Sequence, residues 1–204
     1  MKKSKVMLFG AMALTAGLAL AACGSSQSSN ADKTYSYIFV NNPDTLDYIT
    51  STRDSTSSIT TNLIDGLLEN DQYGNLIPSM AESWTVSKDG LTYTYKIRQG
   101  AKWYTSEGEE YADVTAHDFV TGLKYAADKK AENLYLVQDS IKGLADYVEG
   151  KSSDFGTVGV KAVDDYTFQY TLIQPETYWN SKTTASILSP VNEAFLKSKG
   201  DDFG

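Results

Sequence analysis

The chain of 204 residues contains one cysteine, Cys23, and one histidine, His117. A single thiol cannot form a disulfide within the chain, and a structural zinc site needs about four cysteine or histidine ligands. A nucleophile activated by histidine would have to use His117, which stands in the first turn of an expected helix, where a solvated side chain is the ordinary case. The shortage of both residue types argues against a transition-metal site and against a histidine-based nucleophile.

Other signatures of catalysis are missing as well. No serine lies in a G-x-S-x-G turn, and Gly150-Lys151-Ser152 is not a phosphate-binding loop because Ala145 occupies the position of its first glycine. The acidic pairs are adjacent in sequence, so their side chains point in different directions and indicate turns or solvated surface. These pairs are Glu109-Glu110, Asp164-Asp165 and Asp201-Asp202. We therefore expect neither an enzyme nor a bound cofactor.

Positive charge is scarce, since 18 lysines and arginines stand against 26 aspartates and glutamates and give a formal net charge of −8. Residues 1–22 contain three lysines and no acidic residue, so the remainder of the chain carries −11. An acidic surface repels the phosphate backbone of nucleic acids. Nucleic acid is thus excluded as an expected partner.

The first fifty residues hold one long apolar run without a charge, the fifteen residues Val6–Leu20. It is shorter than the roughly 20 residues that cross a bilayer, and a lysine-rich start followed by an apolar stretch and small residues is typical of a secretory signal peptide. Leu20-Ala21-Ala22-Cys23 resembles a lipobox, whose cysteine is acylated and becomes the first mature residue. The alternative is an ordinary secretory signal that leaves Cys23 unpaired. We expect residues 1–22 to be a lipoprotein signal peptide and Cys23 to be the lipid anchor.

The segment after this cysteine has no large side chain. Residues 24–32 contain nothing larger than Gln27, so residues 23–32 are expected to be a flexible tether between the lipid and a folded domain. Residues 33–204 are long enough for one domain with a hydrophobic core.

Strand patterns occur in five places. Tyr35–Val40 is a short aromatic and β-branched run, and a turn at Asn41-Asn42-Pro43-Asp44 ends it. Leu91–Ile97 alternates apolar and polar residues and follows a Lys88-Asp89-Gly90 turn, which predicts a hairpin with the strand of Trp84 and Val86. Val158–Val163 and Thr167–Leu172 predict a second hairpin.

Helical patterns alternate with these strands. Leucines and isoleucines recur on one face over Ser57–Leu68, and Thr115 with Asp118 three residues later indicates the capping box of a helix. Shorter helices are expected over Ile141–Val148 and Asn192–Lys199. The buried phase of these patterns predicts four core side chains: Leu67, Trp84, Tyr95 and Phe119.

Six blocks, found in order along the chain, carry a family resemblance. They are Asn42–Asp47, Asn62–Leu67, Pro78–Trp84 with Ser87–Arg98, Ala101–Trp103 with Val114–Val120, Val158–Phe168, and Ser189–Val191. Together they resemble the extracytoplasmic solute-binding proteins of family 5, and in particular the oligopeptide-binding lipoproteins of ABC transporters in Gram-positive cocci. Tyr48 departs from the family pattern, which has proline after Leu-Asp.

The resemblance implies a mixed α/β fold of the periplasmic-binding-protein type II class, with two lobes around a cleft. The family pattern extends well beyond residue 204, so the chain is expected to hold the N-terminal lobe and an inserted domain at about residues 50–165, with the second lobe absent. On this expectation the chain is an incomplete part of the family protein.

The resemblance also implies a function and a site. The function is capture of extended peptides outside the cell by a monomeric substrate-binding component, which delivers them to the permease subunits of an ABC importer. The alternative is a surface sensor of peptides or pheromones, or an adhesin, that is not coupled to import. By analogy Asn41, Asn42, Pro43 and Asp44 face the peptide, with Tyr135 as a further candidate. Judged from the residues alone, the segment 41–44 is equally a simple turn.

Overall fold

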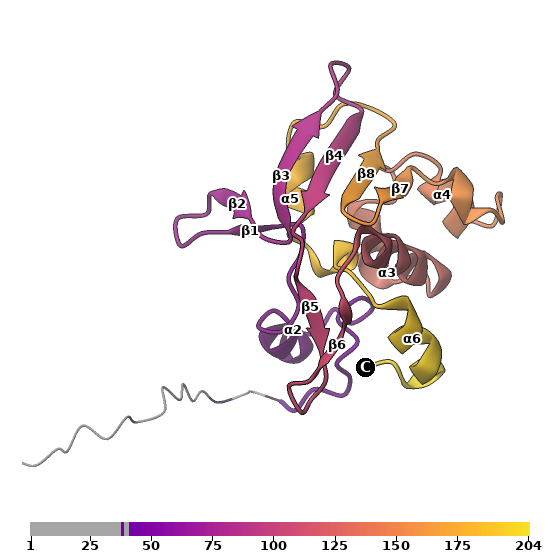
Figure 1. Cartoon of the computed structure of the whole chain (residues 1–204). Helices are drawn as coiled ribbons and strands as arrows, with labels where there is room; N and C mark the ends of the chain where they lie inside the picture. Colours follow the sequence, from indigo (N-terminus) through magenta and orange to yellow (C-terminus); the bar gives the residue numbers. More distant parts are fainter. Residues whose placement is uncertain (1–37, 39–40) are drawn as a thin grey trace, which may run out of the picture. The chain divides into compact units, whose positions relative to one another are not determined.

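A four-stranded antiparallel sheet is the centre of the structure, a computed structural model that describes Ile38 and residues 41–204 (Figure 1). Its strand order is β3-β4-β8-β7. The strands are β3 (Ala81–Val86), β4 (Thr92–Ile97), β7 (Val160–Asp164) and β8 (Thr167–Thr171). Both predicted hairpins are confirmed, and the sheet joins them by pairing β4 with β8.

Several sequence predictions lie outside the described residues. They are the signal peptide, the Cys23 anchor, the tether and most of the strand expected over Tyr35–Val40. Residues 41–204 fall in one compact unit of the chain. No helix within the described residues is long and apolar enough to span a membrane.

Alternation along β4 creates the apolar face of the sheet. Tyr93, Tyr95 and Ile97 are buried, and the register places Tyr95 opposite Phe168 of β8. On this face lie α3 (Ala116–Asp128) and the short helix α5 (Trp179–Lys182), since the Phe119 and Phe168 rings are 5.4 Å apart and the Tyr170 and Trp179 rings 5.1 Å. The aromatic core therefore lies between the sheet and these helices.

The capping box predicted from Thr115 and Asp118 is confirmed at the start of α3. The buried stripe of this helix includes Phe119 and Leu123, as its 3.6-residue period predicts. Gly122 permits a close crossing, because a Cβ atom there would approach the Ser189 carbonyl oxygen to 2.2 Å.

The helix expected over Ser57–Leu68 is wrong in its extent. Helix α2 covers Asp54–Thr60, and the chain is extended again at β1 (Leu68–Asn70), which pairs with β2 (Leu76–Pro78). Leu67 is fully buried as predicted, but it lies in a bend just before β1, and its carbonyl accepts the Ala81 N–H at 2.9 Å. Long-range backbone pairing at Leu67 thus replaces the helix that its apolar spacing suggested.

Two other predictions differ in detail. Helix α4 covers Leu144–Val148 and begins three residues later than expected, because Ile141 forms a β-bridge with Leu172 and Gly143 has a φ of +72°. Trp84 is half-buried at the edge of the core, whereas the other three predicted core residues are buried.

The remaining elements complete the chain. Helix α6 (Glu193–Lys199) is confirmed, with Asn192 as N-cap. A hairpin of β5 (Lys102–Tyr104) and β6 (Glu110–Asp113) extends from the sheet (Figure 1). The described residues also contain four 3₁₀ helices: η2 (Glu132–Leu136), η3 (Phe155–Thr157), η4 (Ser186–Leu188) and η5 (Gly200–Asp202).

The last residues pack against the first described loop. Phe203 is buried, with its ring 5.2 Å from that of Tyr125 and 6.0 Å from that of Tyr48. The Leu46 N–H donates to the Gly204 carbonyl at 2.6 Å. These contacts fix one side of the loop that contains the predicted peptide-facing residues.

Candidate functional site

The predicted segment Asn41–Asp44 lies on the surface without regular secondary structure. Asn41, Asn42 and Asp44 are exposed and Pro43 is half-buried. Within the described part of the chain, the N–H groups of Asn41, Asn42 and Asp44 donate to no other backbone group, and Pro43 has no N–H. Unpaired backbone donors at a surface are available for a ligand or for water.

Asp44 is joined to a residue that sequence reasoning missed. Its Oδ2 lies 3.0 Å from Nε of Arg53, the N-cap of α2, and both side chains are more than half exposed. A surface ion pair of this kind contributes at most about 1 kcal/mol. Its consequence is geometric, because it holds the two ends of the segment 44–53 together.

The other predicted residue, Tyr135, lies in η2 with 73% of its surface exposed. Thr52 Oγ1 donates to Glu132 Oε2 of the same 3₁₀ helix at 3.4 Å. The structure thereby brings η2 next to Thr52 and Arg53. Neither Thr52 nor Glu132 carried a signal in the sequence, since the contact joins residues 80 positions apart.

Asp47 is the buried centre of this loop. Its Oδ1 accepts the N–H groups of Ile49 at 3.0 Å and Thr50 at 3.1 Å. Its Oδ2 accepts the Thr50 hydroxyl at 2.5 Å and the Tyr125 hydroxyl at 2.9 Å. Burial, with the bond to Asp47 and its charge, raises the pKa of the Tyr125 hydroxyl far above its usual value. Tyr125 is therefore a hydrogen-bond donor at any physiological pH.

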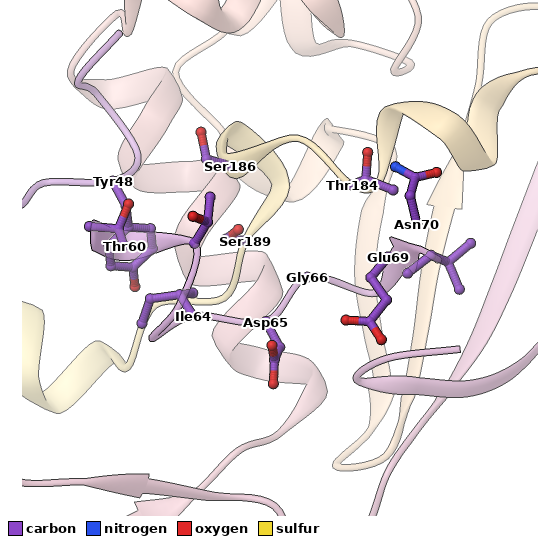
Figure 2. A pocket seen from close by; sticks show the side chains of 12 residues that line it. Tyr48, Thr60, Ile64, Asp65, Gly66, Glu69, Asn70, Thr184, Ser186 and Ser189 are labelled. Carbon is purple, nitrogen blue, oxygen red and sulfur yellow. The ribbon is translucent and has the colours of Figure 1, made fainter. Parts of the chain in front are cut away.

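A cavity of about 220 Å³ with a mixed polar and apolar lining lies beside α2 and β1 (Figure 2). Tyr48 forms part of its wall and donates its hydroxyl to the Pro190 carbonyl at 2.7 Å. Figure 2 shows the carboxylates of Asp65 and Glu69 with the backbone of Gly66 between them. Five threonine and serine residues add hydroxyl groups, while Ile64 and Leu68 add apolar surface. The hydroxyl and carboxylate groups suit water or a small polar molecule. No cluster of three metal-ligating residues occurs among the described residues.

A second pocket, of about 460 Å³, is mainly apolar. It lies between the β5–β6 hairpin and α6, within the size range of small-molecule sites. Aromatic side chains dominate its wall, with Lys199 Nζ 5.5 Å from the Phe195 ring centre. The aromatic residues are Tyr48, Trp103, Tyr104, Tyr111, Phe195 and Phe203.

His117 is exposed in the first turn of α3, where Nε2 lies 3.3 Å from Asp165 Oδ1. Asp164 Oδ1 accepts the Tyr166 N–H at 2.9 Å. This bond stabilises a turn, as predicted for the acidic pair Asp164-Asp165.

Comparison with known proteins supplies the family context. A model of the "Bacterial extracellular solute-binding proteins, family 5 Middle" matches residues 75–204. The chain is 66% identical over 99% of its length to the oligopeptide-binding protein AliB of Streptococcus pneumoniae, and it covers 31% of that protein.

Solved structures agree with the same family. The substrate-binding domain of an oligopeptide ABC transporter from Bacillus anthracis matches 78% of this chain with 36% identity and a TM-score of 0.71. The oligopeptide-binding protein OppA of Listeria monocytogenes, solved with a bound peptide, matches 77% with 34% identity and a TM-score of 0.70. The chain covers 30% of each structure. The mixed α/β fold of the periplasmic-binding-protein type is thus confirmed.

Proposed function

The chain belongs to family 5 of the bacterial extracellular solute-binding proteins, and we propose that it is part of the oligopeptide-binding component of an ABC importer. The observation that carries the proposal is the 66% identity to AliB across nearly the whole chain. The chain spans about a third of the length of the relatives that it matches. The activity that we propose is therefore an activity of the whole protein and not of this chain by itself.

We propose that the segment 41–44, together with Thr52 and Arg53, faces the peptide. The N–H groups of Asn41, Asn42 and Asp44 can pair with the carbonyl groups of an extended ligand, which gives affinity that does not depend on side-chain sequence. Tyr135 belongs to the same 3₁₀ helix as Glu132, which accepts a hydrogen bond from Thr52, and its exposed ring would offer a flat surface to the peptide. The two proposed contact regions, residues 41–44 and Tyr135, both belong to the described residues. Peptide binding of this kind requires no catalytic group.

The proposed inserted domain begins at about residue 50. Its proposed end, at about residue 165, falls in the turn between β7 and β8. Both of these strands belong to the sheet of β3 and β4, so the topology favours an end beyond Thr171.

The proposed location is the extracytoplasmic face of the cell membrane, with Cys23 as lipid anchor. The proposed protein is a monomer that hands peptides to permease subunits. These proposals come from the lipobox resemblance and the family, since Cys23 lies outside the described residues.

Peptide uptake tests this function against the alternative of a sensor or adhesin. Uptake of radiolabelled oligopeptides is compared in cells with and without the complete gene, with a glucose analogue as control solute. We expect peptide uptake to fall while control uptake is unchanged. Equal peptide uptake in both strains, in cells that lack a second peptide importer, would exclude the transport role.

A further inference from the structure

The carboxylate of Asp47 is buried without a cation. Its residue is 5% exposed, and no ion pair to it occurs in the described part of the chain. A buried charge needs hydrogen bonds to offset its lost hydration. Asp47 has four, of which three come from Ile49 and Thr50 in its own loop and one comes from Tyr125 in α3.

The bonds of Asp47 extend to the ends of the loop. The Ser51 N–H donates to the Asp47 carbonyl at 3.0 Å, and the Ser51 hydroxyl accepts the Arg53 N–H at 3.3 Å. The Thr56 hydroxyl donates to the Thr45 carbonyl at 2.8 Å. A displacement of Asp47 would therefore move Arg53 and, through the ion pair, Asp44.

We propose that Tyr125 is a positioning residue, whose hydroxyl holds Asp47 and thereby sets the conformation of the loop from Asp44 to Arg53 for ligand binding. This inference rests on the proposed peptide-binding function. Tyr125 itself need not touch the peptide, because it acts through Asp47. The Tyr125 hydroxyl can hold Asp47 in place because α3, which carries Tyr125, is itself fixed by its capping box and by its buried residues.

The hydroxyl and the ring of Tyr125 have separate roles. The ring packs against Phe203 at 5.2 Å, and Tyr125→Phe keeps this contact while it removes the bond to Asp47. Tyr147 offers a matched control. Its hydroxyl also donates to a carboxylate, Asp128 Oδ1 at 2.6 Å, and its ring packs against Phe155 at 5.1 Å, but this bond is exposed and remote in sequence from the loop.

A second pair of variants tests the same bond from the other side. In Asp47→Asn the amide oxygen can still accept the Ile49 and Thr50 N–H groups, while its nitrogen can donate to the Tyr125 hydroxyl. Asp47→Ala removes all four bonds. The proposal predicts that Asn, and not Ala, retains the loop conformation.

The experiment uses the complete mature protein as cells produce it. Amide hydrogen exchange is followed over residues 48–53, and affinity is measured for the tightest-binding member of a pentapeptide library screened against the parent protein. We expect Tyr125→Phe to exchange faster in this segment and to bind about 3- to 10-fold more weakly, since one hydrogen bond to a charged group is lost. Tyr147→Phe should stay within about twofold of the parent in both measurements.

The outcomes separate the inference from the proposed function. Parent-like exchange and affinity in Tyr125→Phe would overturn the positioning role. If that variant does not fold, equal affinities of Asp47→Asn and Asp47→Ala would overturn it instead. A parent protein that binds no peptide would refute the proposed function, while the exchange comparison would still decide whether Tyr125 orders the loop.

Discussion

The indole N–H of Trp103 donates to Oδ2 of Asp118 at 3.1 Å, and the same oxygen accepts the N–H of Thr115 at 2.8 Å. One buried carboxylate therefore caps α3 and attaches the β5–β6 hairpin to it. The hairpin forms a wall of the apolar pocket of about 460 Å³, so this bond connects α3, the longest helix among the described residues, to that pocket.

Removal of the indole donor should destabilise the protein. Trp103→Phe leaves the buried Asp118 one donor short, and we expect a loss of about 1.5 to 3 kcal/mol in the free energy of unfolding. Trp84→Phe is the control, because Trp84 is half-buried with no side-chain hydrogen bond in the described set, and it should cost less than about 1.5 kcal/mol. Equal losses in urea denaturation would show that the bond contributes nothing.

Asp118 should also make stability depend on pH. Burial raises the pKa of its carboxyl above the usual 3.8, partly offset by the hydrogen bonds from Thr115 and Trp103. A carboxyl with a raised folded-state pKa favours folding when protonated, so its contribution is complete below about pH 3.8 and is lost as the pH rises through the folded pKa. As the pH rises from about 3.8 to the folded pKa, we expect the free energy of unfolding of the parent to fall relative to that of Asp118→Asn. A difference between the two that does not vary with pH would contradict this.

Three of the four predicted core side chains should be costly to truncate. Leu67, Tyr95 and Phe119 are at most 1% exposed, and each alanine variant should lose about 2 to 5 kcal/mol of unfolding free energy. Tyr73→Ala, with a side chain 80% exposed, should change it by less than about 0.5 kcal/mol. Cooperative unfolding with unchanged midpoints in all three core variants would refute the assignment.

The fold could be predicted where local signals were strong. The β3–β4 hairpin follows from strict alternation and a Gly90 turn with φ +74°, and α3 follows from its capping box. The segment around Leu67 failed because its apolar spacing fits a helix, whereas its backbone pairs with Ala81. A helical period cannot reveal a partner strand elsewhere in the chain.

The site was less predictable than the fold. The family resemblance indicated Asn41–Asp44 and Tyr135, but not the residues that connect them. Thr52 meets Glu132, and Asp47 meets Tyr125 across 78 positions, so only folding brings these side chains together. Asp47 was visible in the sequence as part of a motif, without any sign of its four hydrogen bonds.

The proposed lipid anchor has a direct test in cells. Cys23→Ala should leave unprocessed precursor or release the protein into the medium, because the acylated residue is lost. Globomycin treatment of the parent should likewise cause precursor to accumulate. Processed and membrane-bound protein after the Cys23→Ala substitution would contradict the anchor.

The central claim is peptide binding by the whole protein, to which this chain contributes one part. Relatives are about three times as long, so residues 23–204 alone should offer only part of the contacts to a peptide. We expect the isolated segment to bind no tighter than about millimolar, or roughly 4 kcal/mol, whereas the proposed function needs micromolar binding, or roughly 8 kcal/mol.

Calorimetric titration with oligopeptides tests this claim most directly. The complete mature protein and residues 23–204 are titrated with the same pentapeptide library members at equal concentration. The account predicts saturable binding at about micromolar concentrations by the complete protein and no saturation by the segment. Absence of saturable binding by the complete protein would contradict the account.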